Sequence, residues 1–434
     1  MSKRTDTIFA FSSGALPAGV AVVRISGRKA LEALAQLTRK ERPQPRLLVL
    51  RRLLDRRGDL LDEALVVSFP GPSSFTGEDC VELHLHGSRA VVNSVLSELA
   101  ALDGFRMAEA GEFSRRAFEN GRLDLVEVEG LSELIAAETE MQRRLAVEQS
   151  FGGQSKLYEN WASRLTYARA MIEAELDFAD EDDVPGSLGE KVTSDIAAVA
   201  AEIENHLAKA KGGEIIRGGY KVAIVGPPNA GKSSLMNHLA QRDVAIVTDI
   251  AGTTRDILHV DLDMEGYLVR LFDTAGLRET EDTVEREGIR RTHQMIEQAD
   301  LVLALEEIGG MSGPPPYPSG DVIRVGTKLD LAGVSLDHDL SISVETGAGI
   351  EELRQQIISR IQSVWSGSSA PTRARQTELL RLTSFSVGSA LKEEKLEFRA
   401  EHLRAAAGSL GRITGHVDVE QLLDVIFSQF CIGK

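Results

Sequence analysis

The sequence predicts an α/β plus all-α protein in three parts: an N-terminal α/β domain, a helical domain split into two segments, and a second α/β domain inserted between them. Three observations predict this arrangement. Strand-like and helical runs alternate up to about residue 120. Helical patterns rich in Ala, Glu and Leu fill residues 124–211 and return over 373–434. A strand, a glycine-rich loop and a helix stand between these segments, which indicates an inserted domain.

The N-terminal domain is expected over residues 1–121, with strands at 20–25, 63–69 and 80–85 and helices near 29–38 and 88–102. The remaining boundaries are the first helical segment at 122–217, the inserted α/β domain at 218–364 and the second helical segment at 365–434. We expect the pairs Gly212-Gly213 and Gly218-Gly219 to form a hinge at the entry to the inserted domain.

Composition narrows the class of protein. The chain has 434 residues, 42% of them apolar, but no run of 18 apolar residues and a polar N-terminus, so neither a membrane span nor a secretory signal is predicted. Its two cysteines, Cys80 and Cys431, cannot make a disulfide framework, which fits the cytoplasm. A net charge of −17 implies that any RNA contact is local or supplied by a partner.

The most informative motif is Gly226-Pro-Pro-Asn-Ala-Gly-Lys232-Ser233, between the strand-like run 220–225 and the helical run 234–240. This is the context of a P-loop, in which backbone N–H groups and a helix N-terminus bind phosphates. Lys232 is placed to reach the β- and γ-phosphates, and the Ser233 hydroxyl to bind Mg²⁺. An ordinary glycine-rich turn is the structural alternative.

Further motifs follow in the order of a Ras-like GTPase. Asp273-Thr-Ala-Gly276 ends the strand-like run 268–272, where Asp273 can hold Mg²⁺ through water and Gly276 can meet the γ-phosphate. Thr253-Thr254 suits a switch threonine on Mg²⁺ that orders with the triphosphate. These motifs together predict an inserted Ras-like P-loop G domain.

Base recognition is predicted for Thr327-Lys328-Leu-Asp330, which follows the strand-like run 322–325. The Asp330 carboxylate can accept two hydrogen bonds from guanine, and adenine offers no such pair. Ser343-Val344-Glu345 is the expected last loop against the base. Thr327 stands where the usual motif has Asn, which weakens side-chain bracing of this loop.

A second departure concerns hydrolysis. Leu277 follows the Asp-Thr-Ala-Gly motif where Ras-like GTPases have a water-orienting glutamine, and leucine cannot do this. The candidate replacements are the carboxylates just downstream, although a solvated acidic stretch is the structural alternative: Glu279, Glu281, Asp282, Glu285 and Glu287.

Motifs along the whole chain resemble the MnmE (TrmE) family of tRNA-modification GTPases, of the TrmE-Era-EngA type. They lie at residues 74–79, 111–118, 120–124, 177–184, 246–257, 273–278 and 430–434, the last being Phe-Cys-Ile-Gly-Lys. The resemblance implies an N-terminal domain that binds a tetrahydrofolate derivative (5-formyl- or 5,10-methylene-), a split helical domain and an inserted G domain.

The resemblance also implies an activity and partners. Such a GTPase works with an FAD-containing partner, MnmG (GidA), as a heterotetramer that modifies C5 of the wobble uridine of certain tRNAs with a folate one-carbon unit. It is a homodimer whose G domains dimerise in GTP and K⁺. The alternatives are a K⁺-dependent GTPase of ribosome assembly, which leaves the folate-domain motifs unexplained, and a folate-binding scaffold that only binds nucleotide.

Site residues follow from the same resemblance. Glu285 is the expected water-orienting carboxylate, K⁺ is expected on Asn229 and on the carbonyls of Thr248, Ile250 and Thr253, and Mg²⁺ on Ser233 and Thr254. The expected GTP-binding residues are Asn229, Ala230, Gly231, Lys232, Ser233, Ser234, Thr248, Asp249, Ile250, Ala251, Gly252, Thr253, Thr254, Asp273, Thr274, Ala275, Gly276, Thr327, Lys328, Asp330, Ser343, Val344 and Glu345. The expected folate-binding residues are Arg24, Glu82, Arg122 and Lys434. The loop Leu16-Pro-Ala-Gly19 departs from the family's Gly-Arg-Gly-Gly type.

Three further features of the sequence each have two interpretations, one structural and one functional. Cys431 is either a thiol nucleophile toward the uridine or a small packing residue. His84 and His86 share one face of a strand and are expected to pack rather than to bind metal. A basic cluster is either a solvated face or a contact to tRNA phosphates: Arg39, Lys40, Arg42, Arg46, Arg51, Arg52, Arg56 and Arg57.

Overall fold

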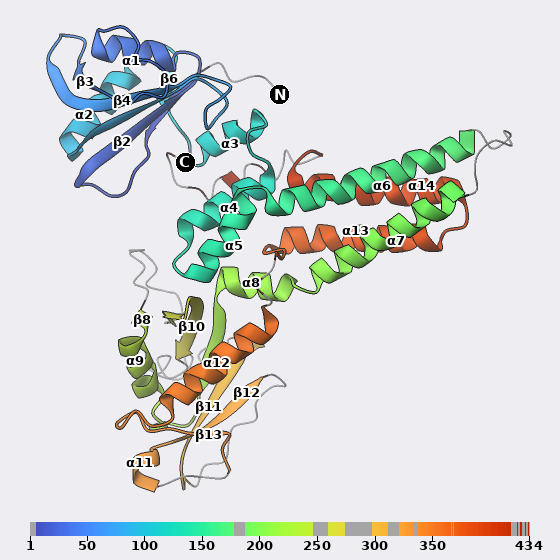
Figure 1. The fold of residues 1–434 in the computed structure, drawn as a ribbon. Coiled ribbons are helices and arrows are strands. Elements are labelled where there is room, and N and C mark those ends of the chain that lie inside the picture. Colours follow the sequence, from blue (N-terminus) through green and yellow to red (C-terminus); the bar gives the residue numbers. More distant parts are fainter. Residues whose placement is uncertain are drawn as a thin grey trace, which may run out of the picture. The chain divides into compact units, whose positions relative to one another are not determined.

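The computed structural model describes residues 6–177, 187–245, 259–273, 297–310, 321–332, 337–365, 367 and 369–417, together with positions 423, 426, 427, 430 and 433. The chain divides into two compact units, Met1–Ser132 with Gly411–Lys434 and Glu133–Leu410. Figure 1 shows the elements of both units coloured along the sequence. Within the described residues, no helix is long and apolar enough to cross a membrane.

The first unit is built on a six-stranded sheet of order β3-β4-β5-β2-β1-β6 (Figure 1). All its pairs are antiparallel except the parallel pair of β1 with β6. The elements are β1 (Thr7–Phe11), β2 (Ala18–Ser26), α1 (Ala30–Thr38), β3 (Val49–Leu54), β4 (Leu60–Phe69), β5 (Cys80–Gly87), α2 (Arg89–Ala100), β6 (Phe105–Met107), α3 (Glu112–Glu119) and α4 (Leu125–Ala136). The predicted mixed α/β class is therefore confirmed for this region.

One face of this sheet is covered by α1 and α2. Leu34 of α1 and Val95 of α2 are fully buried in one cluster with Val23, Ile25 and Leu83 from the central strands. Side chains alternate between faces along a strand, so the residues between these positions lie on the opposite face. That opposite face carries Val20, Val22 and Arg24 from β2 and Glu82, His84 and His86 from β5.

Residues far along the chain complete the first unit. Leu423, Ile426, Phe427 and Phe430 share a buried cluster with Leu125 and Val128 of α4. Gly111 has φ +66°, and a β-carbon there would lie 2.5 Å from the Phe427 carbonyl oxygen, so this position needs glycine. A β-carbon on Gly433 would likewise lie 2.3 Å from the carbonyl oxygen of Phe11, so this position also needs glycine.

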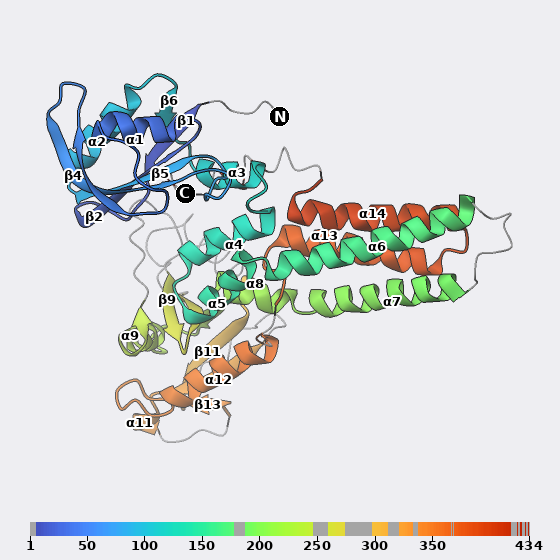
Figure 2. The same cartoon turned by 45° about the horizontal axis from the view of Figure 1, so that its top comes forward.

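The helical part of the second unit is made by two segments that lie far apart in the sequence. Helices α6, α7, α13 and α14 run alongside one another in both views (Figures 1 and 2). The helices are α5 (Glu140–Ser150), α6 (Gly153–Asp177), α7 (Ser187–Leu207), α8 (Ala210–Gly218), α13 (Ala374–Lys392) and α14 (Leu396–Thr414).

Side chains join the two helical segments directly. Gln149 donates to the Thr372 hydroxyl at 3.0 Å, and Arg399 donates to the Thr193 hydroxyl at 2.9 Å. Arg373 pairs with Glu133 at 3.0 Å. The predicted split helical domain with an inserted nucleotide-binding domain is confirmed by this arrangement.

The predicted glycine hinge is wrong for Gly212 and Gly213. Both residues lie inside α8, and β-carbons there would approach the carbonyl oxygens of Val364 and Pro371 to 2.6 and 2.5 Å. Their small size lets the chain entering the inserted domain pack against the chain leaving it. Gly218 ends the same helix, and Gly219 follows with φ +85°. The pairs thus build a tightly packed junction.

The inserted domain is a seven-stranded sheet of order β13-β12-β11-β7-β10-β9-β8. Strands β10, β7, β11, β12 and β13 are parallel, and β9 runs antiparallel to β10. The elements are β7 (Tyr220–Val225), α9 (Lys232–Arg242), β8 (Val244–Ala245), β9 (His259–Met264), β10 (Tyr267–Asp273), β11 (Leu301–Glu307), β12 (Val322–Thr327), α11 (Leu329–Ala332), β13 (Leu340–Ser341) and α12 (Ile350–Val364).

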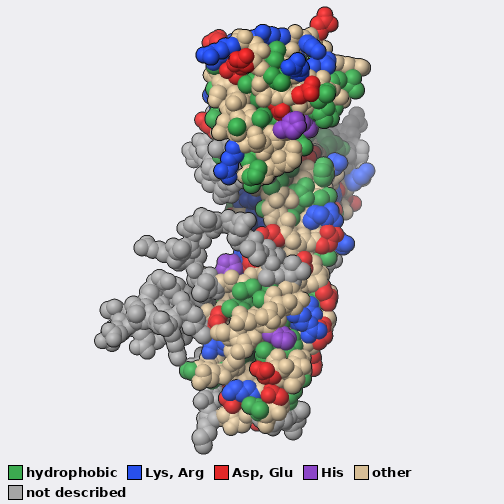
Figure 3. All heavy atoms as spheres, turned by 90° about the vertical axis from the view of Figure 1, so that its left-hand side faces the viewer, with side chains coloured by type: hydrophobic (Ala, Val, Ile, Leu, Met, Phe, Trp, Pro, Cys, Tyr) green, Lys and Arg blue, Asp and Glu red, His purple; other side chains and the backbone are tan. Residues whose placement is uncertain are grey.

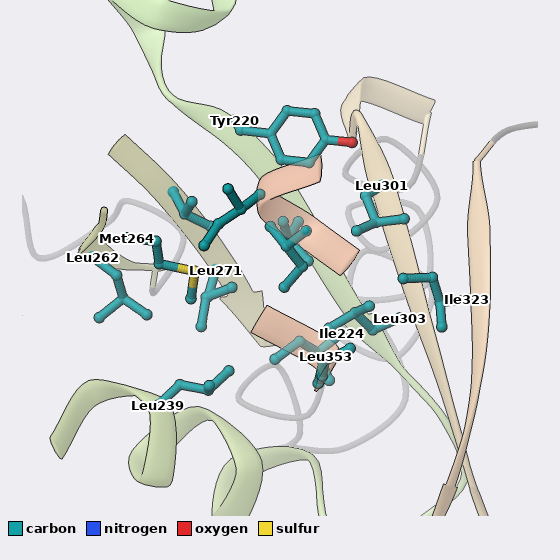
Figure 4. Close-up of a cluster of buried hydrophobic side chains, with 14 of the residues drawn as sticks. Tyr220, Ile224, Leu239, Leu262, Met264, Leu271, Leu301, Leu303, Ile323 and Leu353 are labelled. Atoms are coloured by element: carbon teal, nitrogen blue, oxygen red, sulfur yellow. The ribbon is translucent and has the colours of Figure 1, made fainter. Parts of the chain in front are cut away.

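Its core joins the sheet to the helices. Figure 4 shows Ile224, Leu271 and Leu303 from three strands beside Leu239 of α9 and Leu353 of α12. All five side chains are fully buried. Burial of one such side chain contributes about 1.5–3 kcal/mol, so this cluster holds the strand ends in place.

Candidate functional site

The candidate nucleotide site lies where the parallel strands of the inserted domain end. The loop 226–231 follows β7, Asp273 is the last residue of its neighbour β10, and the motif 327–330 begins at the end of β12. Because β10, β7, β11 and β12 are parallel, these ends meet at one edge of the sheet. Ligands of open α/β sheets bind at this edge.

The loop 226–231 is shaped by close contact with the sheet. Gly226 has φ +156°, and a β-carbon there would lie 2.4 Å from the Leu305 carbonyl oxygen. Gly231, at φ +89°, precedes α9, which begins at Lys232. The free N–H groups of a helix N-terminus attract anions. Asn229 adopts φ +64° and is exposed, as are Ser233 and Ser234, whereas Ala230 is buried.

Lys232 is held at the mouth of this loop. Its side chain curls back, and Nζ donates to the carbonyl oxygens of Gly226 at 2.9 Å and Pro227 at 2.8 Å. The residue is only 8% exposed. A buried ammonium group favours charged partners, so a phosphate oxygen is a strong additional acceptor at this position.

A hydrogen bond joins the side chains of Ser233 and Asp273, which are two oxygen donors. The Ser233 hydroxyl donates to Asp273 Oδ2 at 2.9 Å, and Asp273 is 7% exposed. A hydroxyl and a carboxylate are the hard oxygen donors that Mg²⁺ prefers, usually with several waters retained. The described residues therefore fit Mg²⁺ beside the phosphate loop.

Hydrogen bonds tie the predicted base loop to two neighbouring strands. The buried Thr327 hydroxyl donates to the Glu306 carbonyl oxygen at 3.1 Å, so threonine provides bracing here despite the missing asparagine. The hydroxyl of Ser343, which follows β13, donates to Asp330 Oδ1 at 2.5 Å. Lys328, at φ +62°, pairs with Glu307 at 2.7 Å. Val344 is partly exposed and Glu345 exposed in the same loop.

Several predicted residues lie outside the described part of the chain. They include the water-orienting candidate, most K⁺ ligands, one Mg²⁺ ligand, the C-terminal lysine and the C-terminal thiol: Thr248, Asp249, Ile250, Ala251, Gly252, Thr253, Thr254, Thr274, Ala275, Gly276, Glu285, Lys434 and Cys431. Leu277 and the other acidic candidates, at 279–287, also lie outside the described residues.

A second cluster occupies the first unit. Arg24 Nη2 and Glu82 Oε1 lie 3.0 Å apart, from directly paired positions of β2 and β5. The Arg24 guanidinium lies over the rings of Phe75 and Phe113, at 5.4 and 5.7 Å from their centroids. The sequence motifs 74–79 and 111–118 contain Phe75 and Phe113, but they do not predict that either ring contacts Arg24.

The predicted residue Arg122 lies at the same loop as Phe75. A β-carbon on Gly77 would lie 3.2 Å from Arg122 Cγ, and Arg122 is exposed. Arg24 and Arg122 each lie beside a residue of the loop 74–79, Arg24 at Phe75 and Arg122 at Gly77, and Glu82 pairs with Arg24. A cation and a carboxylate beside an aromatic ring suit a flat heterocycle with an anionic tail.

A network of ion pairs and hydrogen bonds holds the loop 74–79 through Glu78. Arg116 pairs with Glu78 at 3.0 Å and with Glu112 at 3.1 Å, and the Ser26 hydroxyl donates to Glu78 at 2.8 Å. Burial favours the neutral form of Glu112, but hydrogen bonds from Arg106 and the Glu109 backbone win, lowering its pKa to about 2. The loop therefore rests on groups that stay charged at neutral pH.

The remaining sequence candidates have partners of different kinds. Cys80 is a buried free thiol, 3.2 Å from the Thr76 hydroxyl. Within the basic cluster, Arg56 pairs with Glu98 at 3.1 Å and Arg39 donates to the Asp55 carbonyl oxygen at 3.0 Å. Figure 3 shows Lys and Arg interspersed with Asp and Glu over the visible face of the N-terminal domain.

A phosphate-binding loop, a serine–aspartate pair beside it and an aspartate base loop on parallel strands define a GTP-binding protein of the P-loop class. Two family models match the chain: "GTP-binding protein TrmE N-terminus" over residues 7–122 and "MnmE helical domain" over residues 125–431. The chain is 57% identical to "tRNA modification GTPase MnmE" of Sinorhizobium medicae, over 99% of both chains. It is 56% identical to the protein of the same name from Agrobacterium fabrum, over 100% of both. The chain belongs to the MnmE family of tRNA modification GTPases.

Solved structures of other proteins are similar to part of the chain. The G domain of the T. maritima FeoB iron transporter shares 26% identity over 33% of this chain and 99% of that one, with a TM-score of 0.25. An Aquifex aeolicus Era variant shares 23% identity over 41% of this chain and 69% of that one, with a TM-score of 0.26. At these TM-scores neither likeness adds to the family assignment.

Proposed function

We propose that this protein is a potassium-dependent GTPase that takes part in modifying C5 of the wobble uridine of certain tRNAs. The observation that carries the GTPase part is the meeting of Lys232, the Ser233–Asp273 pair and the Ser343–Asp330 pair at one sheet edge. Membership of a family named for tRNA modification supports the substrate.

Each side chain of the nucleotide site has a distinct role in this proposal. Lys232 neutralises charge on the β- and γ-phosphates, Ser233 and Thr254 hold Mg²⁺ directly, and Asp273 holds it through water. Asp330 accepts two hydrogen bonds from guanine. Asn229, with the carbonyls of Thr248, Ile250 and Thr253, holds K⁺ where charge develops in the transition state. Glu285 accepts a hydrogen bond from the attacking water and orients it.

The first unit supplies the folate site. Arg24, Glu82, Arg122 and Lys434 are proposed to bind a tetrahydrofolate derivative that supplies the one-carbon unit. Support for this comes from the Arg24–Glu82 ion pair at 3.0 Å and from Arg122 beside the same loop. The protein acts in the cytoplasm as a homodimer, with an FAD-containing partner in a heterotetramer, and its G domains dimerise during hydrolysis.

Two measurements test the proposal. Purified protein should hydrolyse GTP faster in KCl than in NaCl at equal ionic strength; equal low rates in both would leave only a nucleotide-binding scaffold. Cells lacking the protein should lose the C5 modification in mass spectrometry of tRNA nucleosides. Unchanged nucleosides together with accumulated ribosomal precursors would instead support a GTPase of ribosome assembly.

A further inference from the structure

Arg24, Glu82 and His84 are polar side chains on the face of the N-terminal sheet that α1 and α2 leave uncovered. Arg24 of β2 pairs directly with Glu82 of β5. His84 lies two residues further along β5, opposite Val22 of β2 and Leu65 of β4. Since alternate residues of a strand point to the same side, Glu82 and His84 are neighbours on this face.

The two oxygens of Glu82 have different surroundings. Oε1 accepts from Arg24 Nε at 3.1 Å and lies 3.0 Å from Arg24 Nη2. Oε2 lies 3.5 Å from His84 Nε2, too far for a good hydrogen bond. Within the described residues, the His84 Nε2 atom has no hydrogen-bond partner, although the atom itself is buried. Such an atom costs free energy until a partner reaches it.

His86 provides a contrast on the same strand and the same face. Its Nδ1 lies 2.7 Å from Asp62 Oδ1, and its backbone N–H donates to Asp62 Oδ2 at 2.8 Å. The His86 side chain is 73% exposed, against 28% for His84. Thus His86 is held by a carboxylate, whereas the buried Nε2 atom of His84 lacks a hydrogen-bond partner among the described residues.

The aromatic ring of Phe75 lies next to the Arg24–Glu82 ion pair. Phe75 is 37% exposed and lies under the Arg24 guanidinium, which is itself fixed by Glu82. A chain of contacts therefore leads from the Phe75 ring through Arg24 and Glu82 to His84. An aromatic ring beside a polar edge favours a planar ligand, because ring faces pack against one another.

We propose that His84 is a ligand-binding residue of the folate site, where it contacts the pterin ring together with Glu82. A pterin edge carries adjacent N–H donors and a carbonyl oxygen. Glu82 Oε2 accepts from the N–H groups, and His84, in the tautomer protonated at Nε2, donates to the carbonyl oxygen. This inference rests on the proposed folate site and adds a residue that the sequence assigned to packing.

The test is binding of 5-formyltetrahydrofolate to the full chain by titration calorimetry. His84→Leu removes the ring nitrogen and should weaken binding about tenfold, the usual effect of losing one such hydrogen bond. His84→Gln retains a side-chain donor and should recover part of that loss. His86→Leu is the matched control and should bind within about twofold of the parent, because His86 is committed to Asp62.

Circular dichroism and thermal unfolding of every variant should match those of the parent, which shows that the unit carrying His84 is folded; GTP affinity is an additional control for the other unit. Tetrahydropterin without the glutamyl tail should show the same loss with His84→Leu, since the contact is to the ring. The inference is overturned if the parent binds the folate and His84→Leu binds it equally well, or if only the tailed ligand is affected. A parent chain that binds no folate removes the proposed folate site itself, which a comparison of variants alone would not reveal.

Discussion

The Ser343 hydroxyl donates a hydrogen bond to Asp330 Oδ1 at 2.5 Å. The two residues follow different strands, β12 and β13, and Ser343 is fully buried. The Ser343 hydroxyl also accepts from the Thr346 N–H at 3.2 Å. One serine therefore joins the two loops expected to hold the base and fixes the orientation of the Asp330 carboxylate.

Asp330→Asn should change the preferred base. The amide offers a donor where the carboxylate accepts two hydrogen bonds, so GTP affinity should fall by about 10- to 100-fold. Xanthosine triphosphate, which carries an oxygen at the amino position of guanine, should bind better than to the parent. Competition between the two nucleotides measures this. Unchanged preference would mean that residues 327–330 do not contact the base.

Ser343→Ala should weaken GTP binding without changing the preferred base. The carboxylate keeps its charge but loses its fixed orientation, so a loss of about 3- to 10-fold is expected. Ser359→Ala is a suitable control, because that hydroxyl bonds within its own helix by donating to the Gln356 carbonyl oxygen. Equal affinities of parent and Ser343→Ala would show that the bond to Asp330 does not orient the carboxylate for guanine.

Asn229→Ala should remove the potassium dependence. Its exposed side chain, at φ +64° in the phosphate loop, offers an oxygen that a cation can share with the phosphates. Exchange of Na⁺ for K⁺ should raise the parent's hydrolysis rate on the order of 10²-fold, and the variant should show no such gain. Asn237→Ala changes an exposed asparagine of α9 outside the loop and should behave as the parent.

Glu285→Ala should abolish turnover and preserve GTP binding. The residue is proposed to touch the attacking water and not the nucleotide, so kcat should fall by about 10²- to 10⁴-fold. Single-turnover hydrolysis in KCl and a nucleotide titration separate the two effects. Glu352→Ala, an exposed carboxylate of α12, is the control. If Glu285→Ala hydrolyses GTP at the parent rate, Glu281, Asp282 and Glu287 become the candidates.

Acid should weaken the helical domain through His206. Burial, with a smaller effect of Lys209, lowers the pKa of His206 from 6.5 to about 4, and His206 Nε2 lies 3.0 Å from the Tyr158 hydroxyl. Well above pH 6.5 the His206 side chain is neutral in both the folded and the unfolded chain. As the pH falls, the unfolded chain binds the proton first, so the free energy of unfolding should decrease by about 1 kcal/mol by pH ~5.5.

The neighbouring tryptophan provides the measurement. Trp161 and His206 have ring centroids 5.6 Å apart, so fluorescence of a Trp365→Phe chain reports unfolding around this site. His206→Gln retains a partner for Tyr158 but does not titrate. Its stability should be lower than that of the parent at neutral pH and should lack this decrease between pH ~6.5 and ~5.5. An equal pH dependence in both chains would exclude His206 as the cause.

Local sequence patterns predict strands whose side chains are regularly apolar, and they miss strands in which charged residues interrupt that pattern. Strands β2, β4 and β5 were predictable because apolar residues alternate or run together over their length. The edge strand β3 was not, since Arg51 and Arg52 interrupt its apolar pattern. An edge strand has one free side, so charged residues are compatible with it.

The role of a glycine pair is also hard to predict from the sequence. A glycine pair marks either a flexible turn or a close approach of two backbones, and the sequence does not distinguish them. Gly212 and Gly213 are of the second kind, and only the neighbouring carbonyls of Val364 and Pro371 show this. In the candidate sites, motif order identified Asp330 and Ser343. The hydrogen bond between them, and the different partners of His84 and His86, depend on contacts between strands.

The packing of Phe427 and Phe430 against the region of Gly111 has a consequence for synthesis on the ribosome. Residues 1–132 emerge first, yet the side chains that close their core are translated only after the whole segment 133–410. At typical elongation rates this delay is on the order of tens of seconds. Throughout that time Leu125 and Val128 of the nascent chain lack their final cover. Trigger-factor-like chaperones that shield apolar surface should therefore affect the yield of this protein more than that of one whose first domain is closed by its own residues.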